Sequence, residues 1–281
     1  MKKGRLYLII SAAIYGFIPV LAKQVSISGG NSVTTVFLRS VLSLPLILIM
    51  MYKKKVSLAV SRRELWKIIV LGAGGFAPSM VLLYAAYGRS AVGVATMLHF
   101  IYPFIIVLIC ALFFREKMPK LKWLGTAAAA LGVLLSLDMK TEALGAALAA
   151  LSGLFYAFFV IFMDKSGIDR MNYLKLTFYL SLIMAATSLI MCLTGEGVQL
   201  PEDLDGWVSA VFISILTTVF AIPLFQLGVK YEGASEAGIL SMAEPVVGII
   251  LGAALLSEPV TIVGLVGCVM MGIGIICVEK A

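Results

Sequence analysis

The feature that most constrains this chain is a succession of ten apolar segments, separated by short connections that contain charge, glycine or proline. Each segment is close to the roughly 20 residues that a helix needs to cross a bilayer. In lipid such segments must be helices, because open strands would leave backbone groups unpaired. With 61% hydrophobic and 13% charged residues, the chain has too little polar surface for a soluble fold. The segments lie at about 5–22, 32–52, 66–88, 92–114, 121–138, 143–164, 172–193, 206–229, 234–256 and 261–278.

The basic residues predict how these helices cross the membrane. Most of the 22 Lys and Arg residues fall in connections that would share one side with the N-terminus. The exceptions are Lys23, Arg89 and Lys140 in the opposite connections, and Arg39 within a segment. Because positive residues accumulate on the cytoplasmic side, the net charge of +7 indicates membrane orientation and not a nucleic-acid partner. We therefore expect an all-α integral membrane protein of the cell (inner or plasma) membrane, with ten transmembrane helices and both termini cytoplasmic.

The sequence offers no conventional metal, cofactor or catalytic site. Its four cysteines lie in apolar segments without CxxC spacing, and a single histidine cannot form a histidine-rich metal cluster. The chain has no GxxxxGK[ST] phosphate loop, HExxH pair or GxSxG elbow. An ATP-driven pump or a membrane hydrolase therefore has no supporting motif, and we expect no enzyme activity, no cofactor and no metal.

A fixed offset of 142 residues relates the two halves of the chain. Tyr102-Pro103 is followed by Glu116, Gly125 and Gly132. The residues at the same spacing in the second half are Glu244-Pro245, Glu258, Gly267 and Gly274. We therefore divide the chain into two repeats, 1–140 and 141–281. Because each repeat has five helices, an odd number, the second enters the membrane inverted, which is typical of secondary transporters.

These repeated residues also carry a resemblance to a known family. The apolar helix with Pro103 or Pro245, the glutamate at its end and the two later glycines resemble the EamA family of ten-helix permeases, within the drug/metabolite transporter superfamily. The resemblance implies a central cavity lined by the first, third, fourth, sixth, eighth and ninth helices. It also implies transport of small metabolites, amino acids among them. Many members have Trp-Gly in the first helix, where this chain has Tyr15-Gly16.

Glu244 is the strongest candidate for a working residue. It lies about 15 Å of helix rise into its segment, near the bilayer centre, where a lipid-facing carboxylate would be costly. His99 precedes Pro103 by one turn, as Ser241 precedes Pro245. His99 with Tyr102 and Ser241 with Glu244 therefore form two polar stripes on related helix faces. We expect Glu244 or His99 to carry a proton, with a buried structural contact as the alternative for each.

Further candidates follow from depth and helix position. Tyr15 and Tyr156 lie near mid-membrane, each four residues after a serine, Ser152 in the second case. Each offers an apolar ring and one hydroxyl to a substrate, and simple core packing is the alternative. Arg39 is a candidate contact for a substrate carboxylate, or it reaches outward to the headgroups. Weaker candidates, from polarity and helix identity, are Tyr84, Phe220 and Gln226.

Prolines inside four segments predict places where the helices bend. They are Pro78, Pro103, Pro223 and Pro245, with Gly72, Gly74 and Gly75 just before the first. Glu116 and Glu258 close their helices and are expected to have structural roles.

Together these features favour a secondary active, proton-coupled transporter of small metabolites that works by alternating access. The preferred substrates are amino acids or related zwitterions, moved outward. An importer or multidrug exporter with the same cavity, and a membrane protein that binds or senses a ligand without transport, are the alternatives. We expect a small-molecule substrate, protons and the lipid bilayer as partners, and a monomer or homodimer.

Overall fold

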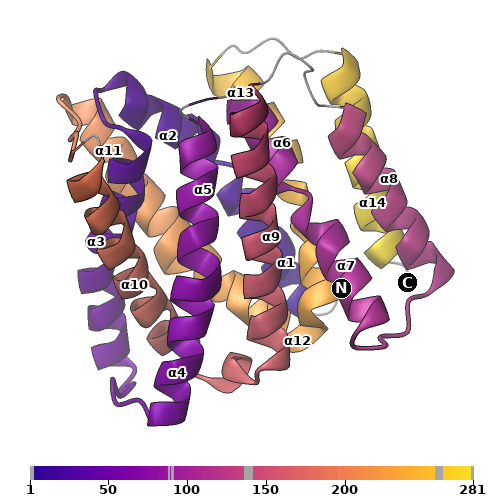
Figure 1. Cartoon of the computed structure of the whole chain (residues 1–281), viewed down its shortest axis with the longest axis horizontal. Coiled ribbons are helices and arrows are strands. Elements are labelled where there is room, and N and C mark those ends of the chain that lie inside the picture. The colour runs from indigo at the N-terminus through magenta and orange to yellow at the C-terminus, as the bar shows by residue number, and fades with distance from the viewer. Residues whose placement is uncertain are drawn as a thin grey trace.

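A computed structural model describes residues 3–87, 89, 92–135, 142–195, 197–256 and 262–279, and all regular structure in these ranges is helical. The helices stand side by side in one bundle (Figure 1). The junction of the two predicted repeats, together with Lys140 and Glu258, lies outside the described residues. In the first half the elements are α1 (Lys3–Tyr15), α2 (Ile18–Ile27), α3 (Ser32–Lys53), α4 (Arg62–Leu71), η1 (Gly72–Phe76), α5 (Ala77–Tyr87), α6 (Val92–His99), α7 (Tyr102–Leu112) and α8 (Lys120–Leu135). In the second half they are α9 (Ala143–Lys165), η2 (Ile168–Arg170), α10 (Tyr173–Thr194), α11 (Leu204–Ile213), η3 (Ser214–Ala221), α12 (Ile222–Leu240), α13 (Ala243–Leu256) and α14 (Ile262–Glu279).

Within the described ranges, seven helical stretches are long and apolar enough to cross a membrane. One of them, Leu204–Leu240, contains Gly233 with φ 84°, a non-helical conformation that kinks the chain and suits glycine. The predicted segment 234–256 is not one continuous helix, because a turn at 241–242 separates α12 from α13. Large apolar side chains such as Ile49, Leu108 and Phe212 are about half exposed on the outside of the bundle, as lipid contact allows.

The four prolines predicted to bend helices each lie in the first turn of a helical segment that follows an interruption. This is where proline fits best, since its missing N–H is not needed there. Two of these interruptions, η1 and η3, are π-helical turns before α5 and α12. The other two are short turns, between α6 and α7 and between α12 and α13. The same kind of interruption thus occurs at corresponding places in both halves.

Polar caps explain where several helices begin. Asn31 accepts a hydrogen bond from the Thr34 N–H at the start of α3, and Asp203 accepts one from the Gly206 N–H at the start of α11, both at 2.8 Å. At α4, Ser61 and Glu64 form a reciprocal capping box. These residues satisfy backbone donors where the chain leaves the apolar part of the bundle.

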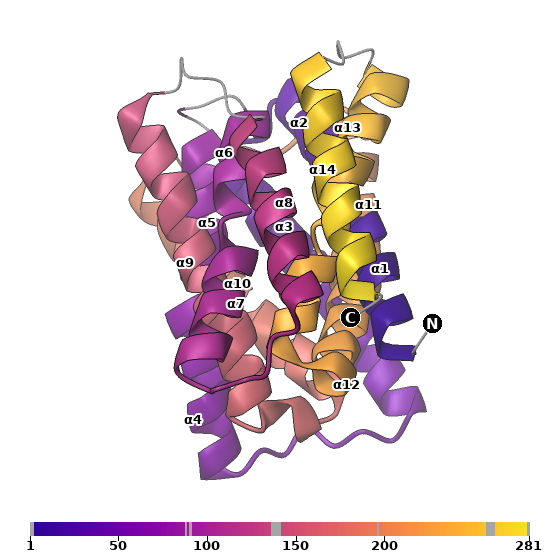
Figure 2. The same ribbon diagram turned by 90° about the vertical axis from the view of Figure 1, so that its right-hand side faces the viewer.

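Each half packs against the other across the middle of the bundle. The main cross-half pairs are α1 with α12, α3 with α10, α5 with α9, and α8 with α14. Figure 2 shows α8 and α14 side by side, and places both chain ends toward the same end of the molecule as the connection between α3 and α4. A Cβ at Gly125 of α8 would lie only 2.7 Å from the Gly274 carbonyl oxygen of α14. Two glycines of the repeated motif therefore allow this close helix contact.

Candidate functional site

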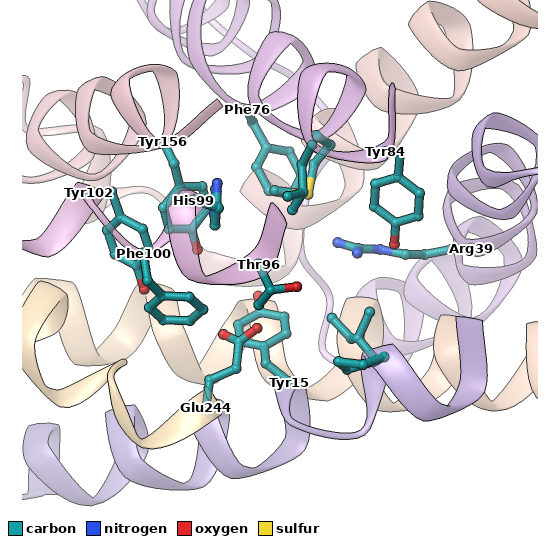
Figure 3. Close-up of a pocket in the computed structure, with 14 residues that line it drawn as sticks. Tyr15, Arg39, Phe76, Tyr84, Thr96, His99, Phe100, Tyr102, Tyr156 and Glu244 are labelled. Carbon is teal, nitrogen blue, oxygen red and sulfur yellow. The ribbon is translucent and has the colours of Figure 1, made fainter. Parts of the chain in front are cut away.

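A small cavity of about 50 Å³ lies between the two halves (Figure 3). Six separate parts of the chain contribute to its wall, and most of the side chains are aromatic or apolar. The wall consists of Tyr15, Ile18, Pro19, Arg39, Phe76, Met80, Leu83, Tyr84, Thr96, His99, Phe100, Tyr102, Tyr156 and Glu244.

Helix interruptions deliver several of these side chains to the cavity. Tyr15 is the last residue of α1, His99 the last of α6 and Phe76 the last of η1. Tyr102 is the first residue of α7, and Glu244 is the second of α13. Broken helices with polar groups near the midplane are the usual way in which transporters build a substrate site. The cavity therefore lies where four breaks in the helices meet: the end of α1, the end of η1, the turn between α6 and α7, and the start of α13.

Two glycines let these interruptions approach their neighbours. A Cβ at Gly16, just after α1, would lie 2.7 Å from Val247 Cβ and 3.1 Å from the Glu244 carbonyl oxygen. A Cβ at Gly153 of α9 would lie 2.5 Å from the His99 carbonyl oxygen. Any larger residue at these positions would push α13 or the α6–α7 turn away, so both glycines help to shape the cavity.

Opposite charges face the cavity from different helices. Arg39 comes from α3 and has only 4% of its surface exposed, so it does not reach outward to the headgroups. Glu244 comes from α13, and the two groups interact electrostatically. Figure 3 shows the guanidinium of Arg39 beside Tyr84 and the carboxylate of Glu244 beside Tyr15. Buried charges are expensive in a membrane and are kept mainly where they pair or bind a ligand.

His99 is held in one orientation by a serine behind it. Its Nδ1 lies 2.8 Å from Ser152 Oγ, and that hydroxyl donates its single proton to the Ala149 carbonyl oxygen at 2.6 Å. Nδ1 is therefore the donor in the first contact, which leaves Nε2 of a neutral ring as an acceptor. The ring centroid lies 5.2 Å from that of Tyr156 and 5.3 Å from that of Tyr102. His99 is thus part of an aromatic wall.

The structure brings seven of the residues singled out in the sequence to one cavity. They are Tyr15, Arg39, Tyr84, His99, Tyr102, Tyr156 and Glu244. Ser152 lies behind His99, and Ser241 donates to the Ala237 carbonyl oxygen and hydrogen bonds with Tyr102, so both stand in a second layer. Phe220 does not line the cavity and is 49% exposed.

Other wall residues were not singled out in the sequence, although helical periodicity could have found some of them. Phe76 and Met80 precede Tyr84 by eight and four residues, and Thr96 precedes His99 by three. Residues at these spacings share a helix face. By contrast, no local pattern marks Phe100, which faces the cavity because of the turn between α6 and α7.

A larger cavity of about 730 Å³ opens at the end of the bundle opposite the chain termini. Its wall is formed by the residues around the α2–α3 connection, the end of α5, the end of α10 and Gln199. Tyr84 lines both this cavity and the central one. The Tyr84 side chain therefore lies between the outer cavity and the central site.

At the other end, polar contacts join the two halves. The ion pairs are Arg5–Glu232 at 3.6 Å, Lys122–Glu236 at 3.2 Å and Lys165–Glu116 at 2.5 Å. Ser235 also donates to Glu116 at 2.6 Å. Burial alone would raise the pKa of Glu116, but the hydrogen bonds from Lys165 and Ser235 and the charges of Lys165 and Lys122 outweigh it, so the pKa is lowered. Glu116 is therefore ionised at neutral pH.

Comparison with known proteins identifies the family. The model of the EamA-like transporter family matches residues 2–137 and again residues 143–279. An uncharacterized transporter of Archaeoglobus fulgidus is 30% identical over 217 residues, 76% of this chain and 78% of that protein. The uncharacterized transporter YcbK of Bacillus subtilis is 23% identical over 94% of this chain and 89% of its own. A crystal structure that is 15% identical has the same fold, with a TM-score of 0.83 over 99% of this chain and 98% of that one.

Two family domains, one in each half, confirm the resemblance inferred from the repeated proline, glutamate and glycines. The relatives are named transporters, which agrees with the expectation of a non-enzymatic membrane protein. This chain belongs to the EamA-like transporter family, within the drug/metabolite transporter superfamily, and is a multi-pass membrane transporter.

Proposed function

We propose that this protein exports small zwitterionic metabolites, amino acids above all, by proton-coupled alternating access across the cell membrane. The observation that carries the proposal is the presence of both Arg39 and Glu244 in the wall of one largely aromatic cavity between the halves. A guanidinium suits a substrate carboxylate, and a carboxylate suits a substrate ammonium group. The tyrosines supply apolar surface and hydroxyls for the rest of the molecule.

Glu244 is also the proposed proton carrier, because it is the one acidic side chain among the described residues of the cavity wall. Protonation would remove its attraction for the ammonium group and for Arg39. A proton and a substrate would then compete for the same carboxylate, which is a simple way to couple their movements. His99 remains the alternative carrier, with its Nε2 as the proton acceptor.

The two ends of the bundle support a cycle between two access states. We assign the end with the chain termini and most basic connections to the cytoplasm, with ten spans in two inverted repeats. On this assignment the ion pairs close the cytoplasmic side, while the 730 Å³ cavity reaches Tyr84 from outside. A 50 Å³ site is smaller than the 300–1,000 Å³ typical of ligand pockets, so binding must widen it.

Transport in proteoliposomes across an imposed pH gradient tests this function. We expect wild-type protein to move labelled amino acids against their gradient. The Glu244→Gln variant should lose this pH-driven accumulation but keep exchange of substrate for substrate. The matched His99→Asn variant keeps a donor toward Ser152 and should retain pH dependence. If Glu244→Gln leaves the pH dependence unchanged, Glu244 is not the coupling residue.

The same assay separates the alternatives. Counterflow of amines or dyes in preference to zwitterions would support a multidrug exporter and contradict the proposed substrate class. Ligand-induced thermal stabilisation without any counterflow would instead indicate a protein that binds or senses its ligand.

A further inference from the structure

A separate cavity of about 360 Å³ lies at the end of the bundle that carries the chain termini. It is formed where the α9–α10 connection and the start of α10 meet α12. Its wall includes Arg170, Tyr173, Leu176, Gln226, Leu227 and Lys230. It shares no described wall residue with the central site or with the outer cavity.

Gln226 points to a ligand in this cavity. Only 4% of its surface is exposed, and its Nε2 donates to Thr177 Oγ1 at 3.0 Å. Its Oε1 is buried and has no hydrogen-bond partner among the described residues. Buried polar atoms are nearly always paired, so a bound donor is expected next to this oxygen. A hydroxyl or an amine would satisfy it.

The rim of the cavity is cationic. Arg170 and Lys230 are both exposed, and Lys230 lies one helical turn after Gln226 on α12. Asp169 is the one acid among the described wall residues, so cations outnumber it. Nearby, Lys54 Nζ donates to the Tyr173 hydroxyl at 2.8 Å, which adds a further positive charge at this edge. An anionic group is therefore attracted to the entrance.

The floor of the cavity is apolar. Leu176 is buried in α10, Leu227 is half-buried on α12, and α10 begins at Tyr173. The cavity thus lies where a predicted span starts, at the depth of lipid headgroups and ester groups. A cationic rim over an apolar floor matches a molecule with an anionic head and apolar chains better than a fully water-soluble one.

We propose that this cavity binds an anionic phospholipid whose headgroup carries a hydroxyl. The phosphodiester lies between Arg170 and Lys230, the headgroup hydroxyl donates to Gln226 Oε1, and the first part of the acyl chains contacts Leu176 and Leu227. The shared chemistry is a hydroxyl-bearing phosphodiester or phosphate, which a lipid or a soluble glycerophosphate could provide. We assign it to the lipid because of the apolar floor.

Native mass spectrometry of the full chain tests the proposal, with phosphatidylglycerol as the probe and phosphatidylcholine, which has no headgroup hydroxyl or net charge, as the comparison. We expect wild-type protein to retain phosphatidylglycerol selectively. Gln226→Leu should weaken its retention roughly fivefold or more, as expected for one lost hydrogen bond. Arg170→Gln with Lys230→Gln should weaken it further.

Matched controls make each variant informative. Thr177→Val removes the hydrogen bond that Gln226 Nε2 donates but keeps Gln226 in the cavity wall, so retention should stay near wild type. Arg63→Gln removes an exposed cation of the same end outside the cavity and should also have little effect. Thermal stability in phosphatidylcholine alone reports whether each variant folds.

Three outcomes would overturn the proposal. Equal retention of the two lipids would show that the cavity does not distinguish their headgroups. An equal loss in Arg63→Gln would show that general surface charge is responsible. Displacement of the lipid by millimolar glycerol 3-phosphate would assign the cavity to a soluble ligand. Lipid retention and thermal stability do not depend on transport, so these experiments test the lipid site separately from the proposed function.

Discussion

At the scale of single residues, the central site depends on which charged groups reach it. Arg39 and Glu244 come from α3 and α13, which lie in different halves, and both face a cavity lined mainly by aromatic rings. A charge in such apolar surroundings is kept mainly where it attracts an opposite charge, so each group favours an oppositely charged part of a substrate. We therefore propose that these two residues determine the chemical selectivity of the site.

Replacing Arg39 with Gln should change substrate preference. The variant loses the proposed carboxylate contact, so the KM for a zwitterionic amino acid should rise about tenfold or more, as for a lost charged hydrogen bond. The KM for the corresponding amine, which has no carboxylate, should change little. Arg39→Lys keeps the charge but not the planar fork, so its KM for the zwitterion should lie between those of the wild type and Arg39→Gln.

Counterflow with matched amino acid and amine pairs provides the measurement. A uniform loss for both substrates would mean that Arg39 supports the fold of the site and does not contact the carboxylate.

At the scale of elements, the interrupted helices need glycine where they touch their neighbours. Gly153→Ala would place a Cβ 2.5 Å from the His99 carbonyl oxygen and 2.8 Å from Ile101 Cγ2. The turn between α6 and α7 would have to move away from α9. We expect a loss of about 1–3 kcal/mol in the free energy of unfolding, the usual cost of overpacking, together with weaker substrate binding.

Thermal unfolding in detergent measures this effect, with Gly272→Ala as the control. A Cβ at Gly272 of α14 meets nothing within 4 Å, and alanine favours helix over glycine, so this variant should be neutral or slightly stabilised. Equal melting temperatures for Gly153→Ala and wild type would contradict the role of Gly153.

At the scale of the whole molecule, the ion pairs at the termini end should hold that side closed. Two native thiols can report this. Cys110 is buried beside the Ser235–Glu116 contact, and Cys192 lines the outer cavity. In a background with Cys268 and Cys277 replaced by alanine, Glu116→Gln should raise thiol labelling of Cys110 severalfold and lower that of Cys192.

The matched variant is Lys165→Gln, which breaks the same ion pair from the other side and should act in the same direction. If labelling of Cys110 does not change in either variant, these contacts do not control access.

The pH dependence of this closure follows from the sign of the Glu116 shift. Its pKa is lowered in the folded protein, so its contribution is complete above the ordinary carboxyl range and is lost only when the pH falls through the lowered value. The labelling rate of Cys110 in the wild type, corrected for the rise of the thiolate fraction with pH, should therefore stay constant between about pH 6 and 8. A steep change there would require a different titrating group in the closure.

The class of fold could be predicted from the sequence because lipid leaves the backbone so few choices. Apolar length and the absence of water require helices, and the 142-residue repeat of Pro103, Glu116 and Gly125 is specific enough to indicate the family. The same local reasoning singled out Glu244 and His99, and both line the central cavity. It made Phe220 and Tyr84 equal candidates, but of the two only Tyr84 lines the cavity.

The sequence by itself determined that this chain is a duplicated helical membrane protein of the EamA type, since periodic apolarity and repeated prolines and glycines act locally along the chain. Tertiary structure alone decided that Arg39 and Glu244 line the same cavity, that Ser152 hydrogen bonds with His99 and that Lys165 pairs with Glu116. These contacts join residues 49 or more positions apart. They depend on how helices turn and pack against each other, which no local spacing encodes.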